Sequence, residues 1–141
     1  FNGEFTPCIT NSWTKWKAFL NIDGKIKKFR SNWDACFQLI NMNCIYEKNR
    51  IQYYFEGILH NYIVDFVDEK NKILYEIKPD SMKNKKLNLI KQKYCEDWCK
   101  TNGFVYKIIG DEYFILNYEK IDTIGQPQLK KFKMQVEKWK K

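Results

Sequence analysis

Charged residues interrupt two apolar segments in the middle of the sequence. Asp65 lies in the first segment, and Glu76 and Lys78 lie in the second. On a β-strand alternate side chains point to the same face, so Glu76 and Lys78 place opposite charges side by side. Burying such a pair is costly unless the pair has a compensating role. The pattern therefore predicts a functional site.

A hairpin between the two segments would bring Asp65 close to Glu76. Neighbouring carboxylates are favourable mainly when a divalent cation lies between them. We expect these two carboxylates and the main-chain carbonyl of Ile77 to hold Mg²⁺, or Mn²⁺ in its place, with positions left for water and phosphate oxygens. The Lys78 ammonium would orient or activate the attacking water, or stabilise charge on the phosphate. The reaction implied is phosphodiester hydrolysis.

Hydrophobic periodicity predicts the elements that position these residues. Ser31 can cap a helix, Gly103 can end another, and a short helix can begin at Asp111. The order helix, three strands, helix, strand, helix predicts an α/β or α+β domain with a mixed central sheet. The strands at 45–67 and 72–78 are expected to form an antiparallel meander. Helices are expected over 31–43 and 81–102, and strands over 45–55, 60–67, 72–78 and 104–109, the last of them buried.

The chain of 141 residues has room for one domain, and its hydrophobic content of 44% is enough for a packed core. We expect a core over 29–125, preceded by an accessory segment over 1–28. In that segment Trp13, Trp16, Phe19 and Leu20 have helical spacing and Asp23-Gly24 marks a turn. After Pro127 a basic amphipathic helix is expected, so that 126–141 forms a third region.

The chain carries 25 basic and 17 acidic residues, a net charge of +8. Six lysines and one glutamate lie in 126–141. This excess fits a polyanion such as nucleic acid or an acidic membrane surface. No apolar run is long enough to span a bilayer, so we expect a soluble protein whose partner is DNA and not a membrane.

The five cysteines form no Cys-x-x-Cys pair, and the single His60 cannot complete a zinc set. Cys95 and Cys99 lie four residues apart, which suits the core face of a helix. These observations predict reduced thiols and a cytoplasmic location.

Together these residues resemble the metal-binding core of the PD-(D/E)XK nuclease superfamily. Asp65, ten intervening residues and Glu76-x-Lys78 are similar to its motif, with Val64 in place of the proline. Upstream, Arg30-Ser31-Asn32-Trp33-Asp34-Ala35 resembles the Arg-Ser-x-Trp-Glu-Ala stretch of small phage-type members. Asp34 then matches the acid of the first helix, normally a glutamate, and would support the metal, through water if its shorter side chain does not reach.

The resemblance covers about residues 29–109 and implies a restriction-endonuclease-like fold, Mg²⁺ dependence and DNA, double-stranded or branched, as substrate. The most similar branches are phage-encoded homing endonucleases, phage head-completion nucleases and transposon end-cleaving nucleases. We expect a phage or mobile-element enzyme, with the homing type ahead. Cutting both strands at one position needs two active sites, which a homodimer would supply.

Simpler interpretations remain for several of these residues. Asp34 could close a capping box with Ser31, and Glu76 and Lys78 could form a solvent-facing ion pair on an edge strand. Glu47 is expected to be solvated or structural. Lys91 and Gln92 could contact phosphate, although a solvated helix face is the simpler expectation.

Two other functions also remain open. A virion-assembly or DNA-binding protein could keep the nuclease fold without relying on cleavage. A basic protein could instead bind an anionic membrane surface through its C-terminal amphipathic helix.

Overall fold

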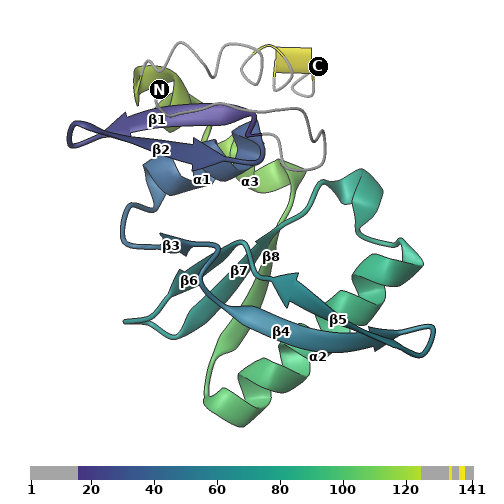
Figure 1. The fold of residues 1–141 in the computed structure, drawn as a ribbon. Helices are drawn as coiled ribbons and strands as arrows, with labels where there is room; N and C mark the ends of the chain where they lie inside the picture. The colour runs from purple at the N-terminus through teal and green to yellow at the C-terminus, as the bar shows by residue number, and fades with distance from the viewer. Residues whose placement is uncertain (1–15, 125–133, 135–136, 139–141) are drawn as a thin grey trace.

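The computed structural model describes residues 16–124, 134 and 137–138. A four-stranded sheet lies at the centre of this part of the chain, in which β7 and β8 are parallel and the other neighbours antiparallel. Two hairpins form separate two-stranded sheets (Figure 1). The predicted mixed α+β architecture is therefore confirmed. The strand order of the central sheet is β3 (Ile45–Tyr46), β6 (Phe66–Asp68), β7 (Ile73–Ile77) and β8 (Val105–Ile109).

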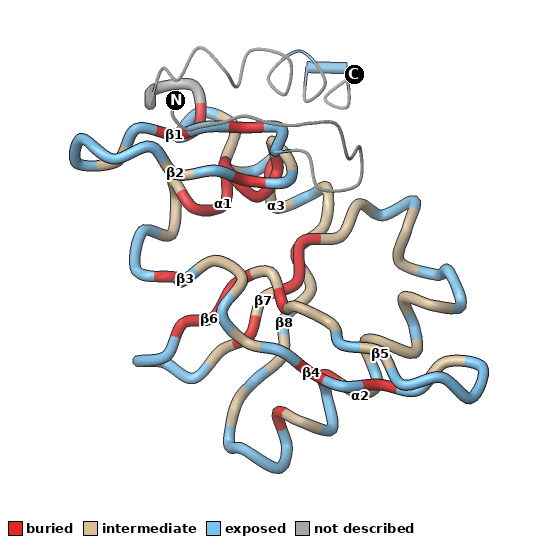
Figure 2. The backbone as a smooth tube through the Cα atoms, viewed as in Figure 1, coloured by how far each residue is buried: buried red, intermediate tan, exposed pale blue. Residues whose placement is uncertain are grey.

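Two helices, α1 (Asn32–Ile40) and α2 (Lys86–Asn102), cover opposite faces of the central sheet. Side chains alternate along the strands, so Phe66 and Tyr75 face the core that α1 contributes to. Their neighbours Val67 and Leu74 face the core beneath α2. Buried segments accordingly run through α1 and the central strands, whereas the tips of both hairpins are exposed (Figure 2).

The N-terminal part of the described chain is a hairpin, not the helix that its aromatic spacing predicts. β1 (Ala18–Ile22) and β2 (Lys25–Phe29) pair through a two-residue turn at Asp23-Gly24, where both residues have positive φ. Alternation buries Ala18, Leu20 and Phe29 in the core of α1. The predicted turn is thus correct. The buried residues, however, recur every two positions, as in a strand, and not every 3.6 positions, as in a helix.

The predicted three-stranded meander is wrong because its first two strands are each broken. The segment 45–55 forms β3 and β4 (Arg50–Phe55), and the segment 58–68 forms β5 (Ile58–Ile63) and β6. β4 and β5 pair with each other and leave the central sheet as a separate ribbon, whose strand β4 packs against α2. We call this hairpin the β4–β5 ribbon.

The C-terminal elements follow the prediction more closely. Gly103 ends α2 in the left-handed conformation, with φ +73°, as its position predicts. A 3₁₀ turn at Asp80–Met82 precedes α2, which therefore begins later than expected. The strand expected to be buried, β8, is half-exposed because it lies at the edge of the sheet. Two short helices follow, α3 (Asp111–Leu116) and α4 (Tyr118–Ile124).

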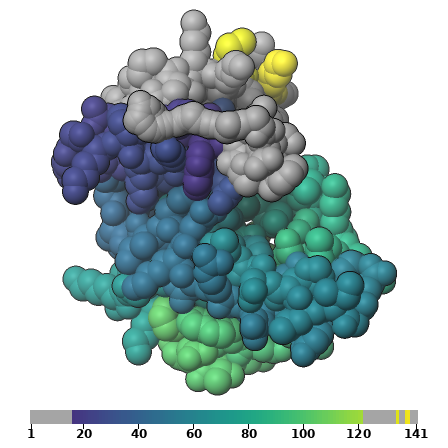
Figure 3. Space-filling model, viewed as in Figure 1, coloured from purple at the N-terminus to yellow at the C-terminus, as the bar shows by residue number. Residues whose placement is uncertain are grey.

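The space-filling view places the first hairpin and α1 at one end of the molecule and the β4–β5 ribbon with α2 at the other (Figure 3). The surface is hollowed between them. In the described part of the chain no helix has the length and apolar character that a membrane crossing requires. Most of the helix expected over 126–141 lies outside the described residues.

We predict that Phe37→Ala lowers the free energy of unfolding by about 3–5 kcal/mol, measured by urea denaturation. Phe37 is 1% exposed and its ring lies 4.8 Å from Phe66 and 5.0 Å from Tyr75, so truncation leaves a cavity beneath the central sheet. The control is Ile58→Ala at the exposed tip of the β4–β5 ribbon, expected within about 0.5 kcal/mol of wild type. Equal effects of the two substitutions would contradict the prediction.

Candidate active site

Asp65 lies at a bend between β5 and β6, not in the middle of a strand as predicted. Its carbonyl oxygen accepts a hydrogen bond from the Glu47 N–H, 2.9 Å away. Its carboxylate Oδ2 accepts one from the Ile77 N–H at 2.8 Å. The bend therefore fixes the Asp65 carboxylate against the end of β7, next to Glu76.

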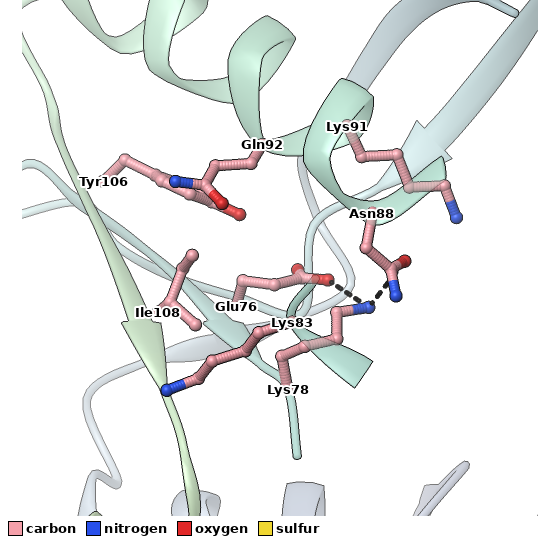
Figure 4. A pocket seen from close by; sticks show the side chains of 8 residues that line it. All are labelled: Glu76, Lys78, Lys83, Asn88, Lys91, Gln92, Tyr106 and Ile108. Atoms are coloured by element: carbon pink, nitrogen blue, oxygen red, sulfur yellow. Dashed lines mark hydrogen bonds and ion pairs between the residues drawn. The ribbon is translucent and has the colours of Figure 1, made fainter. Parts of the chain in front are cut away.

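Glu76 and Lys78 lie at the end of β7 and share a face, as the alternation predicts. Glu76 is only 4% exposed, and its Oε2 lies 3.4 Å from the Lys78 Nζ. Lys78 also donates to the Asn88 Oδ1 of α2, at 3.4 Å (Figure 4). The pair is thus enclosed between the sheet and α2. The interpretation of Glu76 and Lys78 as a solvent-facing ion pair on an edge strand is therefore wrong.

Asp34 lies in the first turn of α1 and uses different atoms for the cap and for the site. Its backbone N–H donates to the Ser31 Oγ at 3.1 Å, which caps the helix. Its carboxylate accepts a hydrogen bond of 2.7 Å from the Tyr46 hydroxyl. The cap therefore leaves the Asp34 carboxylate available to the site.

One pocket of about 320 Å³ brings the predicted site residues together. They come from three parts of the fold: the start of α1, the bend at residue 65 and the end of β7. Sequence spacing alone does not show that these parts meet. The residues lining the pocket include Asp34, Asp65, Glu76, Ile77 and Lys78.

Burial shifts the protonation of all three carboxyl groups in this pocket. It raises the pKa of Glu76 to about 7, although Lys78 and the Asp65 N–H act in the opposite direction. Burial also raises the pKa of Asp34 to about 6, while the Tyr46 hydrogen bond lowers it. The pKa of Asp65 rises through burial and through repulsion from Asp34. The pocket thus gathers negative charge that a cation would stabilise.

These residues fit a hydrated Mg²⁺ ion. The second carboxylate oxygen of Glu76 is buried and has no hydrogen-bond partner, so a bound cation would satisfy it. Mg²⁺ commonly binds one or two carboxylates and keeps several waters. In the described ranges no group of three or more His, Cys, Asp or Glu side chains is placed to hold a metal ion. Asp65 and Glu76 with the Ile77 carbonyl are the groups that would hold the ion, and Asp34, held by Tyr46, would support it.

A second, narrow pocket lies on the α2 side of Glu76 and is lined by three lysine side chains. Its volume of about 10 Å³ is roughly the room that one water needs. Lys78, Lys83 and Lys91 line it together with Gln92 (Figure 4). Lys91 and Gln92 are half-buried, so the expectation of a solvated helix face is wrong for both.

Two tyrosines of the site were missed at the level of sequence. Tyr62 lines the same pocket as Asp65, although strict alternation would put the two on opposite faces, and the bend removes that separation. The Tyr62 hydroxyl is buried and unpartnered, and its ring lies 5.0 Å from the Lys91 Nζ. The second tyrosine is Tyr46, which was expected only as a strand residue and which donates a hydrogen bond to the Asp34 carboxylate.

Glu47 pairs with Arg30 at 2.8 Å, as its structural interpretation predicts.

No protein-family model, curated protein or solved structure significantly matches the chain. Its function is therefore inferred from the geometry of this pocket.

We predict that Glu76→Gln raises the free energy of unfolding at pH 8 in metal-free buffer, by about 2–3 kcal/mol. The carboxyl pKa is higher in the folded protein, about 7, than its ordinary 4.5, so ionisation destabilises the fold as the pH rises through this window. The gain should therefore disappear below about pH 4.5, where the group is protonated in both states. The measurement is urea denaturation across this pH range.

The control for this prediction is Glu69→Gln, which alters an exposed acid paired with Lys48 and should change stability little at any pH. Lower stability of Glu76→Gln at pH 8 would contradict the prediction, because it would show that the ionised Glu76 stabilises the fold.

Proposed function

We propose that the protein is a Mg²⁺-dependent DNA endonuclease with a restriction-endonuclease-like core, a member of the PD-(D/E)XK superfamily. The observation that carries the proposal is the convergence of Asp65, Glu76 and Lys78 on one pocket, where Glu76 is a buried acid with one carboxylate oxygen that has no hydrogen-bond partner. The placement of α1 and α2 on opposite faces of a mixed sheet supports the core. A phage or mobile-element origin, of the homing type, is part of the same proposal.

The residues of the pocket have two kinds of role: some bind the metal ion or the phosphate, and others hold those residues in position. Mg²⁺, when bound by Asp65 and Glu76, would polarise a water and neutralise phosphate charge. Lys78 is held by Glu76 and Asn88, so its ammonium has a fixed position from which to stabilise the charge that builds on the phosphate. Tyr46 orients Asp34 through their hydrogen bond.

Lys91 and Tyr62 extend the cationic side of the site. The Lys91 ammonium lies 5.0 Å from the Tyr62 ring and 5.8 Å from that of Tyr53, so two aromatic faces hold it in place. The Tyr62 hydroxyl is buried and has no hydrogen-bond partner, so we propose that it donates to the bound DNA when the pocket is filled. The net charge of +8 would attract the DNA backbone, and a homodimer would supply the second active site for a double-strand cut.

We predict that wild-type protein cuts plasmid and branched DNA with Mg²⁺ or Mn²⁺, and that Glu76→Ala and Lys78→Ala each slow cutting at least about 100-fold. The first substitution removes a metal ligand and the second removes the ammonium that faces the phosphate. Lys93→Ala is the control, since Lys93 is exposed on α2, and it should cut as wild type does. The measurement is gel analysis of the cleaved strands.

If wild type binds DNA but cuts with neither metal, the rival function, virion assembly or DNA binding on a nuclease fold, replaces the endonuclease. Binding to anionic vesicles without DNA affinity would instead favour the membrane-surface function.

Metal binding can be tested without activity. Excess Mg²⁺ or Mn²⁺ should raise the free energy of unfolding of wild type by about 1–3 kcal/mol, because the ion binds only the folded pocket. Glu76→Gln should lose this increment, since it replaces a carboxylate ligand with a neutral amide, while Glu69→Gln should keep it. Thermal unfolding with and without metal measures the effect. An equal increment in all three proteins would place the ion elsewhere.

A further inference from the structure

A groove lies between the β4–β5 ribbon and the C-terminal half of α2. Its volume of about 590 Å³ exceeds that of the candidate active site. Arg50, Gln52 and Asn61 line it from the ribbon, and Asp97 lines it with aromatic neighbours from α2. None of these residues belongs to the pockets around Glu76.

The chemistry of this groove differs from that of the active site. Lys78, Lys83 and Lys91 line the narrow pocket beside Glu76, whereas the residues described around the groove include no lysine. The charges of Arg50 and Asp97 balance, so the groove offers little net attraction for phosphate. It contains two aromatic side chains, Tyr94 and Trp98, together with amide, carboxylate and guanidinium groups.

Such a set matches the needs of a nucleobase. Aromatic side chains stack on the face of a base, and Asn, Gln, Asp and Arg form hydrogen bonds with its edges. A base reaches a groove walled by a helix and a ribbon only when it has left the double helix. The groove chemistry therefore favours unpaired bases over the phosphates of a duplex.

The groove and the active site are lined by residues of the same two elements. On α2, Lys91 belongs to the narrow pocket and Asp97 to the groove, and six residues of helix separate them by about 9 Å. On β5, Tyr62 lines the active-site pocket, and its neighbour Asn61, on the opposite face of the ribbon, lines the groove.

We propose that this groove binds unpaired nucleobases of the DNA that the active site holds. The inference rests on the proposed nuclease function and adds a preference for DNA with a single-stranded or frayed segment. The active-site pocket holds the phosphate, and the groove holds the bases.

The test compares two DNA duplexes whose single-stranded tails contain the same number of phosphates. One tail contains bases, and the other is made of abasic sugar-phosphate units. Fluorescence anisotropy in EDTA measures binding of the full-length chain, because the strands stay intact without metal. Stacking of a single base is typically worth a five- to hundredfold gain in affinity, so the tail with bases should bind at least about fivefold more tightly.

Matched variants assign this difference to the groove. Asp97→Ala and Gln52→Ala should each reduce the preference for the tail with bases at least about threefold. Glu96→Ala removes a negative charge from the neighbouring exposed position of α2 and should keep the preference. Both Asp97 and Gln52 are exposed, so the folded structure should tolerate their substitution, and circular dichroism checks this.

The failures of the two proposals are distinguishable. Equal binding of the two tails by wild type, or an undiminished preference in both groove variants, would overturn the groove proposal and leave the nuclease intact. Absence of binding to either tail would overturn DNA binding itself, and the groove proposal with it.

Discussion

The carboxylate of Glu76 is buried between the central sheet and α2, where an isolated charge is strongly unfavourable. The surrounding structure offsets this cost with an ammonium from Lys78 and a backbone N–H from Asp65. Asn88 in turn holds Lys78 and donates to the carbonyl of Met82, which ties the loop after β7 to α2. The end of one strand, the following loop and the start of a helix are therefore arranged around one buried charge.

The bend at Asp65 is the second constraint, and it explains why the site is an enclosed pocket. A straight strand would have continued the central sheet and placed Tyr62 and Asp65 on opposite faces. The bend instead sends the β4–β5 ribbon across α2 and turns both side chains to one pocket.

The sequence predicts the structure best where the relevant residues lie within one short segment. Glu76 and Lys78 are two residues apart on a strand, so alternation alone places them together, and Ser31 and Gly103 are local signals for helix ends. The part played by Tyr46 and the break of the meander depend on contacts between distant segments. The N-terminal hairpin could not be predicted because Trp16, Phe19 and Leu20 have the spacing of a helix face, whereas the residues that are buried, Ala18 and Leu20, alternate as in a strand.

The two faces of the central sheet contain two separate pairs of free thiols. Cys36 and Cys44 lie in the core beneath α1, and Cys95 and Cys99 lie in the core beneath α2. Burial raises the pKa of Cys36 to about 12 and those of Cys44 and Cys99 to about 11, which suppresses the reactive thiolate in the folded state. Alkylation of these thiols therefore requires local opening, and the labelling rates of the two pairs report whether the layers on either side of the sheet separate together or one before the other.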